Sequence, residues 1–366
     1  MIRVLHIMAC ADAGGISAVV LNYYRFIDRT KVHFDIALTV PEAGQNVHLL
    51  QELGAEVFFL PLKSQSGLKV FREALEQLLR KGNYQALHVH ESETCYVALQ
   101  VAKKLGIPCR IAHAHTASPY EGIKSELRRL SGCLLNEPVA THLLSCSKLA
   151  GDRVFGKWNM KRSKALMLPN AVDTRRFAFN EQIRREVRKE LQVEDKYVLG
   201  MVGRLSEEKN FPFALDLFAV IRQSHPDCVL VIAGNGDQEE RLRKQISSLG
   251  IEDSVKMLGR RADVDRLCQA YDVYLLPSFH EGFSISVLEA LASGLPAIVS
   301  DTVPHEFDFA SAIHFLPLKD PNIWIEEIMR YRNDSGRTER QHEPRANGYD
   351  IRDTAGILEA IYSSQS

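Results

Sequence analysis

Short apolar segments alternate with longer amphipathic segments along the chain. In the first half, apolar runs at 3–9, 34–40 and 86–91 have the length and composition of buried strands. The segments 15–27 and 70–82 carry apolar residues three and four positions apart, which is typical of a helix with one buried face. Further strands of this half are expected at 56–62, 109–115 and 142–147. Such alternation predicts a parallel sheet that helices cover on both faces.

The second half of the chain repeats this scheme. Strands are expected at 197–203, 228–234, 255–259, 273–278 and 296–301, and helices at 181–193, 211–223, 239–250 and 287–293. Ligands of sheets built in this way bind beyond the carboxyl ends of the strands. We therefore predict an α/β architecture of two Rossmann-like, doubly wound domains that face a central cleft.

The stretch LPNAVDTRRF, which ends at Phe177, separates the two halves. We place the first domain at 1–175 and the second at 176–345. The remaining segment, 346–366, is expected to form a C-terminal helix that packs back on the first domain. The polar segment 333–349 contains scattered Gly, Pro and Arg residues, and it is interpreted as a long loop before that helix.

Composition narrows the class of protein. The 366 residues fit two domains of about 150 residues each. With 45% hydrophobic residues, 25% charged residues and a net charge of −1, the chain is typical of a soluble protein without a nucleic-acid partner. Its seven cysteines are scattered and form no C-x-x-C motif, which indicates a reducing, cytoplasmic environment. No apolar run reaches the roughly 20 residues of a membrane span, and the apolar N-terminus is too short for a signal peptide.

Two pairs of glycines follow predicted strands. Gly14 and Gly15 precede the helix expected at 15–27, where backbone N–H groups can approach an anion. Gly234 and Gly236 hold the same place after the strand at 228–234. In both places the alternative is a purely structural turn between a strand and a helix.

Two cations stand near the end of another predicted strand. Arg204 and Lys209 follow Gly203, so they lie where a ligand of the sheet would bind. Arginine offers paired hydrogen bonds and lysine a point charge, and together they could hold a diphosphate. Glu207 and Glu208 lie between them, so a solvated charged loop is the alternative.

Two carboxylates lie eight positions apart in the segment 280–301. Glu281 follows a predicted strand, and we expect it in a loop that faces the cleft. Glu289 lies in the following helix. It also has a structural interpretation, because Ser286 and Glu289 have the S-x-x-E spacing of a capping box.

Histidines occur in pairs at the ends of two predicted strands, as His88 with His90 and His113 with His115. Residues two apart on a strand share one face of the sheet. The pairs are interpreted either as hydrogen-bonded histidines at the edge of a core or as metal ligands. Because no carboxylate accompanies them, the metal signal is weak and we expect no bound metal.

Taken together, these motifs resemble glycosyltransferase family 4, whose members have the GT-B architecture. HEGFSISVLEALASGLPAIVSD matches the E-x7-E signature of that family, and GRLSEEKN matches its G-R-x4-K motif. LPNAVD matches the interdomain PNGVD, with Ala171 in place of the usual glycine, and GGIS matches the N-terminal Gly-Gly loop. RIAHAHT further resembles the bacterial branch that makes exopolysaccharides and capsules.

The resemblance implies a retaining, metal-independent transferase that takes a sugar from a nucleotide-sugar, most simply a UDP-sugar, and needs no cofactor. Arg204 and Lys209 would hold the diphosphate and stabilise the departing nucleotide. Glu289 would bind the ribose hydroxyls, and Glu281 would face the donor sugar. Of the histidines, His115 is favoured over His113 as the one near the transferred sugar. The other donor-binding positions that the resemblance implies are Gly14, Gly15, Gly203, Gly234, Gly259, Arg260, Gly282, Phe283 and Ser284.

The resemblance also suggests an acceptor. Residues 121–170 contain more Lys and Arg than Asp and Glu, beside apolar residues. The family often extends a lipid-linked sugar, so we expect a glycan or polyprenyl-linked acceptor and peripheral contact with the inner face of the membrane. A solvated helix face is the alternative interpretation of the basic region.

Two other functions remain open from the sequence. A UDP-sugar 2-epimerase of the same architecture would convert its substrate without an acceptor. A non-catalytic subunit would bind a nucleotide-sugar without turnover. The combination of Arg204 and Lys209 with the E-x7-E segment favours the transferase.

Overall fold

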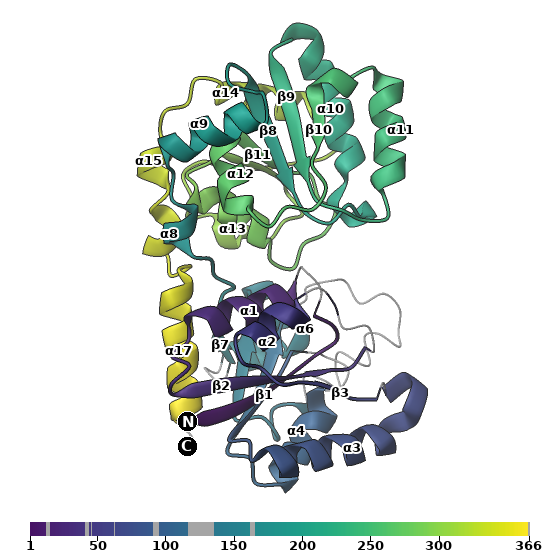
Figure 1. The fold of residues 1–366 in the computed structure, drawn as a ribbon, viewed down its shortest axis with the longest axis vertical. Coiled ribbons are helices and arrows are strands. Elements are labelled where there is room, and N and C mark those ends of the chain that lie inside the picture. The colour runs from purple at the N-terminus through teal and green to yellow at the C-terminus, as the bar shows by residue number, and fades with distance from the viewer. Residues whose placement is uncertain are drawn as a thin grey trace. The chain divides into compact units, whose positions relative to one another are not determined.

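The computed structural model describes residues 1–364, except for 12–14, 41–43, 45, 62, 91–94, 116–134 and 162–164. The chain forms two compact units (Figure 1). Unit 1 comprises residues 1–171 and 351–366, and unit 2 comprises residues 172–350. The chain thus leaves unit 1 four residues before the expected boundary at 175, and it returns at 351 rather than at 346.

Unit 1 is built on a parallel sheet with the strand order β3-β2-β1-β4-β5-β6-β7 in the described part of the chain. The strands are β1 (Ile2–Met8), β2 (Val32–Leu38), β3 (Val57–Phe59), β4 (Ala86–Val89), β5 (Cys109–Ala114), β6 (His142–Ser145) and β7 (Ala165–Met167). The order reverses between β1 and β4. Such a switch point opens a crevice at the carboxyl ends of the two strands, where ligands of doubly wound sheets bind.

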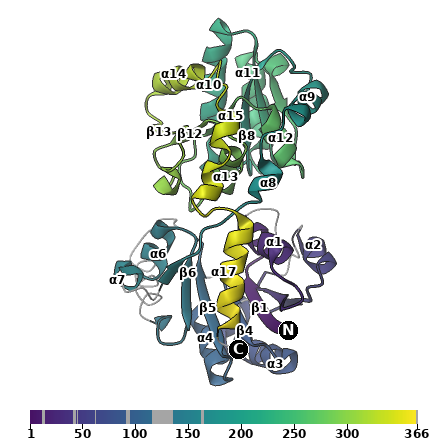
Figure 2. The same ribbon diagram turned by 90° about the vertical axis from the view of Figure 1, so that its left-hand side faces the viewer.

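Helices cover both faces of this sheet. They are α1 (Ile16–Phe26), α2 (Val47–Glu52), α3 (Lys63–Gly82), α4 (Cys95–Lys104), α6 (Lys148–Val154), α7 (Lys157–Lys161) and α17 (Ile351–Ser363). The C-terminal helix α17 belongs to unit 1 and runs across its sheet beside α1 (Figure 2). Tyr362 of α17 is fully buried there, so the end of the chain contributes to the core of the first unit.

Unit 2 contains a second parallel sheet, with the order β10-β9-β8-β11-β12-β13. Its strands are β8 (Tyr197–Val202), β9 (Cys228–Ala233), β10 (Val255–Met257), β11 (Val273–Leu276), β12 (Ala297–Ser300) and β13 (Ile313–Leu316). Its helices are α8 (Thr174–Phe177), α9 (Glu181–Glu190), α10 (Phe211–Ser224), α11 (Glu239–Leu249), α12 (Val264–Ala270), α13 (Ile285–Ala292), α14 (Pro321–Arg330), α15 (Arg337–Arg340) and α16 (Glu343–Ala346), with 3-10 turns η1 (Glu207–Lys209), η2 (Glu252–Ser254) and η3 (His305–Phe307). Here the strand order reverses between β8 and β11.

Two apolar clusters hold unit 2 together, one on each face of its sheet. The first packs α9, α12 and α13 on the sheet through side chains such as Val187, Leu267 and Leu288. The second packs α10, α11 and α14 through Leu215, Leu242 and others. Because every residue of β9 and β11 is buried, these strands read as unbroken apolar runs in the sequence.

The two-domain α/β architecture predicted from the sequence is confirmed, and each predicted strand overlaps an observed one. Two strands escaped prediction, β7 and β13. β7 has three residues, two of them exposed, and all four residues of β13 are only half-buried, so neither gives a strong apolar signal. The interpretation of 333–349 as one long loop is wrong, since α15 and α16 lie within it.

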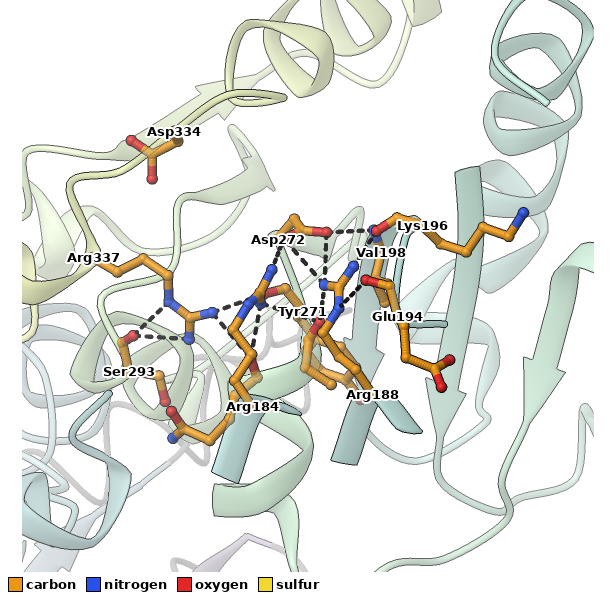
Figure 3. Close-up of polar contacts among 12 residues, drawn as sticks. Arg184, Arg188, Glu194, Lys196, Val198, Tyr271, Asp272, Ser293, Asp334 and Arg337 are labelled. Carbon is orange, nitrogen blue, oxygen red and sulfur yellow. Dashed lines mark hydrogen bonds and ion pairs between the residues drawn. The ribbon is translucent and has the colours of Figure 1, made fainter. Parts of the chain in front are cut away.

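A network of arginines explains why this polar segment is ordered (Figure 3). Arg337 of α15 is buried, and it donates to the carbonyl oxygens of Tyr271 at 2.8 Å and Ser293 at 3.0 Å. Arg184 and Arg188 of α9 form ion pairs with Asp272 at 2.5 Å and 3.2 Å. The three guanidinium groups thus satisfy backbone carbonyls at the end of α12 and anchor the start of β11, the strand that leads to Glu281.

Candidate functional site

The loops at the carboxyl ends of β8, β9 and β10 are joined by backbone hydrogen bonds. Gly203 donates to the carbonyl of Ala233 at 3.0 Å, and Gly234 donates to that of Gly259 at 2.8 Å. A Cβ atom on Gly234 would lie 1.8 Å from the carbonyl oxygen of Gly203, so only glycine allows the two loops to approach this closely. The predicted glycines 203, 234 and 259 therefore line up along one edge of the sheet, and Gly234 has a structural reason to be there.

At the switch point of unit 2, Lys209 meets Glu281. Lys209 follows β8 and Glu281 follows β11, and these two strands are neighbours in the sheet. The ammonium Nζ of Lys209 donates to Oε1 of Glu281 at 2.5 Å, and the hydroxyl of Ser278 donates to the same oxygen at 2.7 Å. A backbone hydrogen bond of 2.8 Å from Phe279 to Glu208 ties the two loops together. The structure thus joins two residues that the sequence singled out independently.

The other predicted cations are exposed. Arg204 stands after β8, and Arg260 follows Gly259 after β10. No side-chain hydrogen bond or ion pair of either guanidinium is found within the described residues. Lys209 donates only one of its three N–H groups to Glu281 among the described residues. This edge of the sheet therefore has further N–H donors on Lys209, Arg204 and Arg260, and an excess of positive charge.

Helix α13 begins at the predicted stretch, but its cap differs from the expected one. Ser284 is the N-cap, and its Oγ accepts a hydrogen bond from the backbone N–H of Val287 at 3.4 Å. The expected capping box of Ser286 with Glu289 is therefore wrong, since both residues lie within the helix. Glu289 is the fifth residue of α13, and the cap gives no structural reason for a carboxylate at that position.

The surroundings of Glu289 favour its neutral form in the absence of a ligand. Burial raises the pKa of Glu289 to about 8, against the opposing effect of the Arg176 cation. Arg176 forms an ion pair of 2.6 Å with Asp265 instead. No hydrogen bond to the Glu289 carboxyl group is found among the described residues. A half-buried carboxyl group without a protein partner can accept hydrogen bonds from a ligand.

Phe283 and Ser284 have structural side chains. The Phe283 ring packs against Phe307 at a centroid distance of 5.0 Å and against Tyr349 at 6.1 Å. The Ser284 hydroxyl caps α13 as described above. A role of the segment 282–284 in ligand binding would therefore fall to its backbone N–H groups rather than to the side chain of Phe283.

In unit 1, Gly15 is the N-cap of α1, with φ of 61° and ψ of −133°, a conformation that disfavours side chains. The predicted partner Gly14 lies outside the described residues. Glycine at this position thus permits the backbone conformation from which α1 begins.

The predicted histidines lie together at the carboxyl ends of β4 and β5. The rings of His88 and His90 have centroids 4.2 Å apart, and those of His113 and His115 are 4.0 Å apart. Each pair therefore shares one face of the sheet, as predicted. His6, which lies in the predicted strand 3–9, was not among the predicted site residues; it pairs with His88 across the β1–β4 ladder.

Residues 121–134 and 162–164 of the basic region at 121–170 lie outside the described residues. Its described part carries apolar side chains at the surface, with Trp158 60% exposed and Leu149 44% exposed. Lys157 and Lys161 are exposed on the same helix as Trp158. Across the helices that the structure describes, we found none with both the length and the apolar character needed to cross a bilayer.

Two family models match the chain. The model described as Glycosyltransferase Family 4 matches residues 13–176, and the model described as Glycosyl transferases group 1 matches residues 182–313. The matches therefore fall on unit 1 and unit 2 in turn.

Relatives of known name align along most of the chain. The glycosyltransferase EpsF of Bacillus subtilis is 32% identical over 99% of this chain and 96% of its own length. A UDP-Gal:α-D-GlcNAc-diphosphoundecaprenol α-1,3-galactosyltransferase of Escherichia coli is 27% identical over 91% of this chain and 88% of its own. These relatives are named as transferases, so the comparisons do not favour the epimerase.

Solved structures share the fold. The UDP complex of HepE from Anabaena has a TM-score of 0.82 at 18% identity and covers all of both chains. The lipopolysaccharide glycosyltransferase WaaG has a TM-score of 0.73 at 15% identity, covering 98% of this chain and 99% of its own. At this level of identity the likeness shows the fold alone.

Proposed function

This chain belongs to glycosyltransferase family 4, and from that premise we propose that it moves a sugar from a UDP-sugar, with retention, to a glycan or lipid-linked glycan of a surface polysaccharide. The observation that carries the proposal is the meeting of Lys209 and Glu281 at the switch point of unit 2, where Arg204 also follows β8. The names of the relatives support the choice of substrates, since one of them uses UDP-Gal and a diphosphoundecaprenol-linked acceptor.

In the proposed reaction, Arg204 and Lys209 hold the diphosphate of the donor. The bond between sugar and phosphate breaks, and the leaving UDP gains negative charge. Fixed cations beside the developing charge stabilise the transition state more than the ground state. Glu281 orients the ammonium group of Lys209 before the donor arrives and then faces the sugar.

The nucleoside end of the donor is assigned to Glu289. Its carboxylate accepts hydrogen bonds from the two ribose hydroxyls, which donate to the ionised form. Hydrogen bonds to the charged form lower a carboxyl pKa, so binding of the donor releases the proton that burial otherwise retains on Glu289. The backbone N–H groups of Phe283 and Ser284 add donors for phosphate oxygens. Arg260 adds a further cation near the strand ends.

A lipid-linked acceptor lies at the membrane, so its use requires that unit 1 contact the membrane surface. Trp158 and Leu149 expose apolar side chains, and Lys157 and Lys161 add positive charge on the helix that carries Trp158. A basic surface with exposed apolar groups binds anionic membranes in two ways: the apolar groups insert into the lipid, and the positive charges attract the anionic headgroups. The protein is thus proposed to act in the cytoplasm and to bind peripherally at the inner membrane face.

A transfer assay tests the proposed activity. UDP-sugars are first screened for binding by calorimetry, and those that bind are then incubated with a polyprenyl-diphosphate-linked sugar. Formation of an extended lipid-linked product supports the transferase. Conversion of the UDP-sugar without an acceptor would support the epimerase instead, and binding without turnover on a panel of acceptors would support the non-catalytic subunit.

A flotation assay tests the membrane contact separately. The protein should float with vesicles that contain phosphatidylglycerol more than with vesicles of phosphatidylcholine alone. Trp158→Ser should reduce flotation. Val220→Ser, at a residue 51% exposed in unit 2, is the matched control and should leave it unchanged. Equal flotation of both variants would contradict the assignment of this surface.

A further inference from the structure

Five histidines and one tyrosine form a buried cluster on one face of the unit 1 sheet. His6 lies on β1, His88 and His90 lie at β4, and His113 and His115 lie at β5. Tyr362 reaches them from α17 and is fully buried. The cluster sits at the carboxyl ends of β1 and β4, which form the switch point of unit 1. We call these six residues the histidine cluster.

Hydrogen bonds divide the cluster into two branches that both start at Tyr362. In the first branch, the Tyr362 hydroxyl lies 2.7 Å from Nδ1 of His88, and Nε2 of His88 lies 3.1 Å from Nδ1 of His113. In the second branch, the Tyr362 hydroxyl lies 3.5 Å from Nε2 of His6, and Nδ1 of His6 lies 2.9 Å from Nε2 of His90. Nδ1 of His90 then lies 2.8 Å from Nε2 of His115.

Each branch ends in a buried nitrogen that no described residue contacts by a hydrogen bond. These atoms are Nε2 of His113 and Nδ1 of His115. The two rings lie side by side, with centroids 4.0 Å apart. A buried polar atom without a partner is costly, so two of them on neighbouring rings indicate a site for a polar ligand.

The spacing of the nitrogens favours shared protons over a shared metal ion. A tetrahedral zinc ion with Zn–N bonds of about 2.0–2.1 Å holds its ligand nitrogens roughly 3.3 Å apart. The paired nitrogens of the cluster are 2.8–3.1 Å apart, which is the range of an N–H···N hydrogen bond. His6, His88 and His90 already use both ring nitrogens in such pairs.

The protonation states of the cluster follow from burial. Burial lowers the pKa of His6 and of His115 to about 3, and it lowers the pKa of His88, His90 and His113 well below the usual range. Burial also raises the pKa of Tyr362 well above its usual value, so the phenol keeps its proton. Each imidazole is therefore neutral at pH 7, with one N–H donor and one lone pair.

One proton on Tyr362 then fixes all five tautomers. The shorter contact assigns the Tyr362 proton to Nδ1 of His88, so His88 donates from Nε2 and the free Nε2 of His113 carries a hydrogen. The Tyr362 oxygen must then accept from Nε2 of His6, and the same alternation leaves the free Nδ1 of His115 with a lone pair. Reversal of the Tyr362 proton would exchange the two roles. In either case, one branch ends in a donor and the other in an acceptor.

We propose that Tyr362 is a positioning residue that sets these tautomers, so that His113 and His115 together present one donor and one acceptor to a hydroxyl group. An alcohol hydroxyl both donates and accepts a hydrogen bond at adjacent points, as a water molecule does in its absence, whereas an ammonium group lacks the acceptor and a phosphodiester or carboxylate anion lacks the donor. That the hydroxyl belongs to a sugar rests on the proposed transferase function. The tautomer pattern itself does not.

Nitrogen NMR of protein labelled with 15N-histidine tests the pattern without any ligand. Two-bond couplings distinguish the Nδ1–H, Nε2–H and imidazolium forms, and His113→Gln and His115→Gln assign the two terminal rings. We expect all five histidines of the cluster as a single tautomer, the Nε2–H form. Different tautomers in the two branches, or imidazolium at pH 7, would overturn the proposal even in an active enzyme.

Tyr362→Phe tests the positioning role, because it removes the hydroxyl and keeps the ring. Its terminal histidines should show mixed tautomers, and kcat/KM for transfer should fall about two- to tenfold, as expected for one impaired hydrogen bond. Tyr331→Phe is the matched control, since Tyr331 also bonds a histidine, His314, at 2.6 Å but lies in unit 2. An unchanged single tautomer in folded Tyr362→Phe would overturn the role of Tyr362. Absence of transfer by wild-type protein with the expected tautomers would overturn only the proposed function.

Discussion

Lys209 donates a hydrogen bond of 2.5 Å to Glu281, across 72 positions of sequence and between the ends of two neighbouring strands. The pair lies at the point where the strand order of unit 2 reverses, and Glu281 is the more deeply buried partner, with 8% of its side chain exposed. The two charges neutralise each other in the absence of a ligand. A diphosphate that binds there must therefore compete with Glu281 for the ammonium group or use its two remaining N–H donors.

Arg204→Ala should lower kcat about 10²–10³-fold with little change in melting temperature. Arg204 is exposed, and its guanidinium makes no hydrogen bond or ion pair among the described residues, so its removal takes away the charge that the proposed mechanism places near the leaving group and little from the fold. Turnover of UDP-sugar and thermal melting are measured side by side. Lys244→Ala, at an exposed lysine of α11, is the control. Wild-type turnover in Arg204→Ala would mean that the loop is only a solvated charge cluster.

Lys209→Met and Glu281→Gln should interact strongly in a double-mutant cycle. Lys209→Met leaves a buried carboxylate without its cation, so it should destabilise unit 2 more than the double variant does, with a coupling of about 0.5–3 kcal/mol. Urea unfolding of the four proteins gives the coupling. The double variant should be as inactive as Lys209→Met, because it regains stability but still lacks the ammonium group of Lys209. Additive stabilities would show that the pair contributes no net interaction.

Donor affinity should depend on pH through Glu289. The pKa of Glu289 is raised to about 8 without a ligand, and ribose hydroxyls favour its ionised form. Between pH 8 and pH 6, Glu289 must lose a proton when the donor binds, so Kd should increase by up to tenfold for each pH unit of acidification. Above about pH 8.5 Glu289 is already ionised, so Kd should level off. Calorimetry with a UDP-sugar measures this, since its diphosphate diester does not titrate in that range.

Glu289→Gln provides the control for that experiment. Glutamine cannot ionise, so the Kd of this variant should be independent of pH, and at pH 8.5 it should be about tenfold higher than that of the wild type. Because Ser284 caps α13, the melting temperature should change little. A pH-dependent Kd in Glu289→Gln would assign the titration to another group.

Transfer activity should survive EDTA. In the proposed mechanism, Arg204 and Lys209 supply the positive charge that a metal ion gives to the diphosphate in other enzymes that use nucleotide-sugars. Initial rates with and without chelator, and with added manganese, are the measurement. Loss of turnover in EDTA that manganese restores would contradict the prediction.

The stability of the protein should decrease on acidification below about pH 6.5 because of the histidine cluster. Above that pH, both folded and unfolded states hold neutral imidazoles and the cluster adds no pH dependence. Between pH 6.5 and 3 the unfolded chain binds protons that the folded cluster, with pKa values near 3 at His6 and His115, does not bind. Each histidine then removes up to about 1.4 kcal/mol of stability per pH unit. Asp35, which lies near His6, opposes this trend only in part.

Urea unfolding at several pH values from 7.5 to 5 measures this slope. His115→Gln removes one titrating group and should make the slope shallower. His305→Gln, at an exposed histidine of unit 2, should leave the slope as in the wild type. A slope that is identical in all three proteins would show that the cluster is not the source of the acid sensitivity.

The sequence by itself determined the architecture and the order of its elements. Strands such as β9 and β11 are buried on both faces, so their apolar runs are visible without a structure. The site motifs were visible for a related reason, because each follows a strand in the sequence and depends on local spacing. The same logic failed for β7 and β13, whose residues are partly solvated and carry no periodic signal.

Only the tertiary structure decided which of these residues meet. The pairing of Lys209 with Glu281 depends on β8 and β11 being neighbours, and no local pattern encodes the order of strands in a sheet. The cap of α13 was decided by the backbone at Ser284 rather than by the S-x-x-E spacing. The histidine cluster combines β1, β4 and β5 with the last helix of the chain, so Tyr362 reaches His6 over 356 positions. Hydrogen bonds act over about 3 Å of space, and only the packed fold sets those distances.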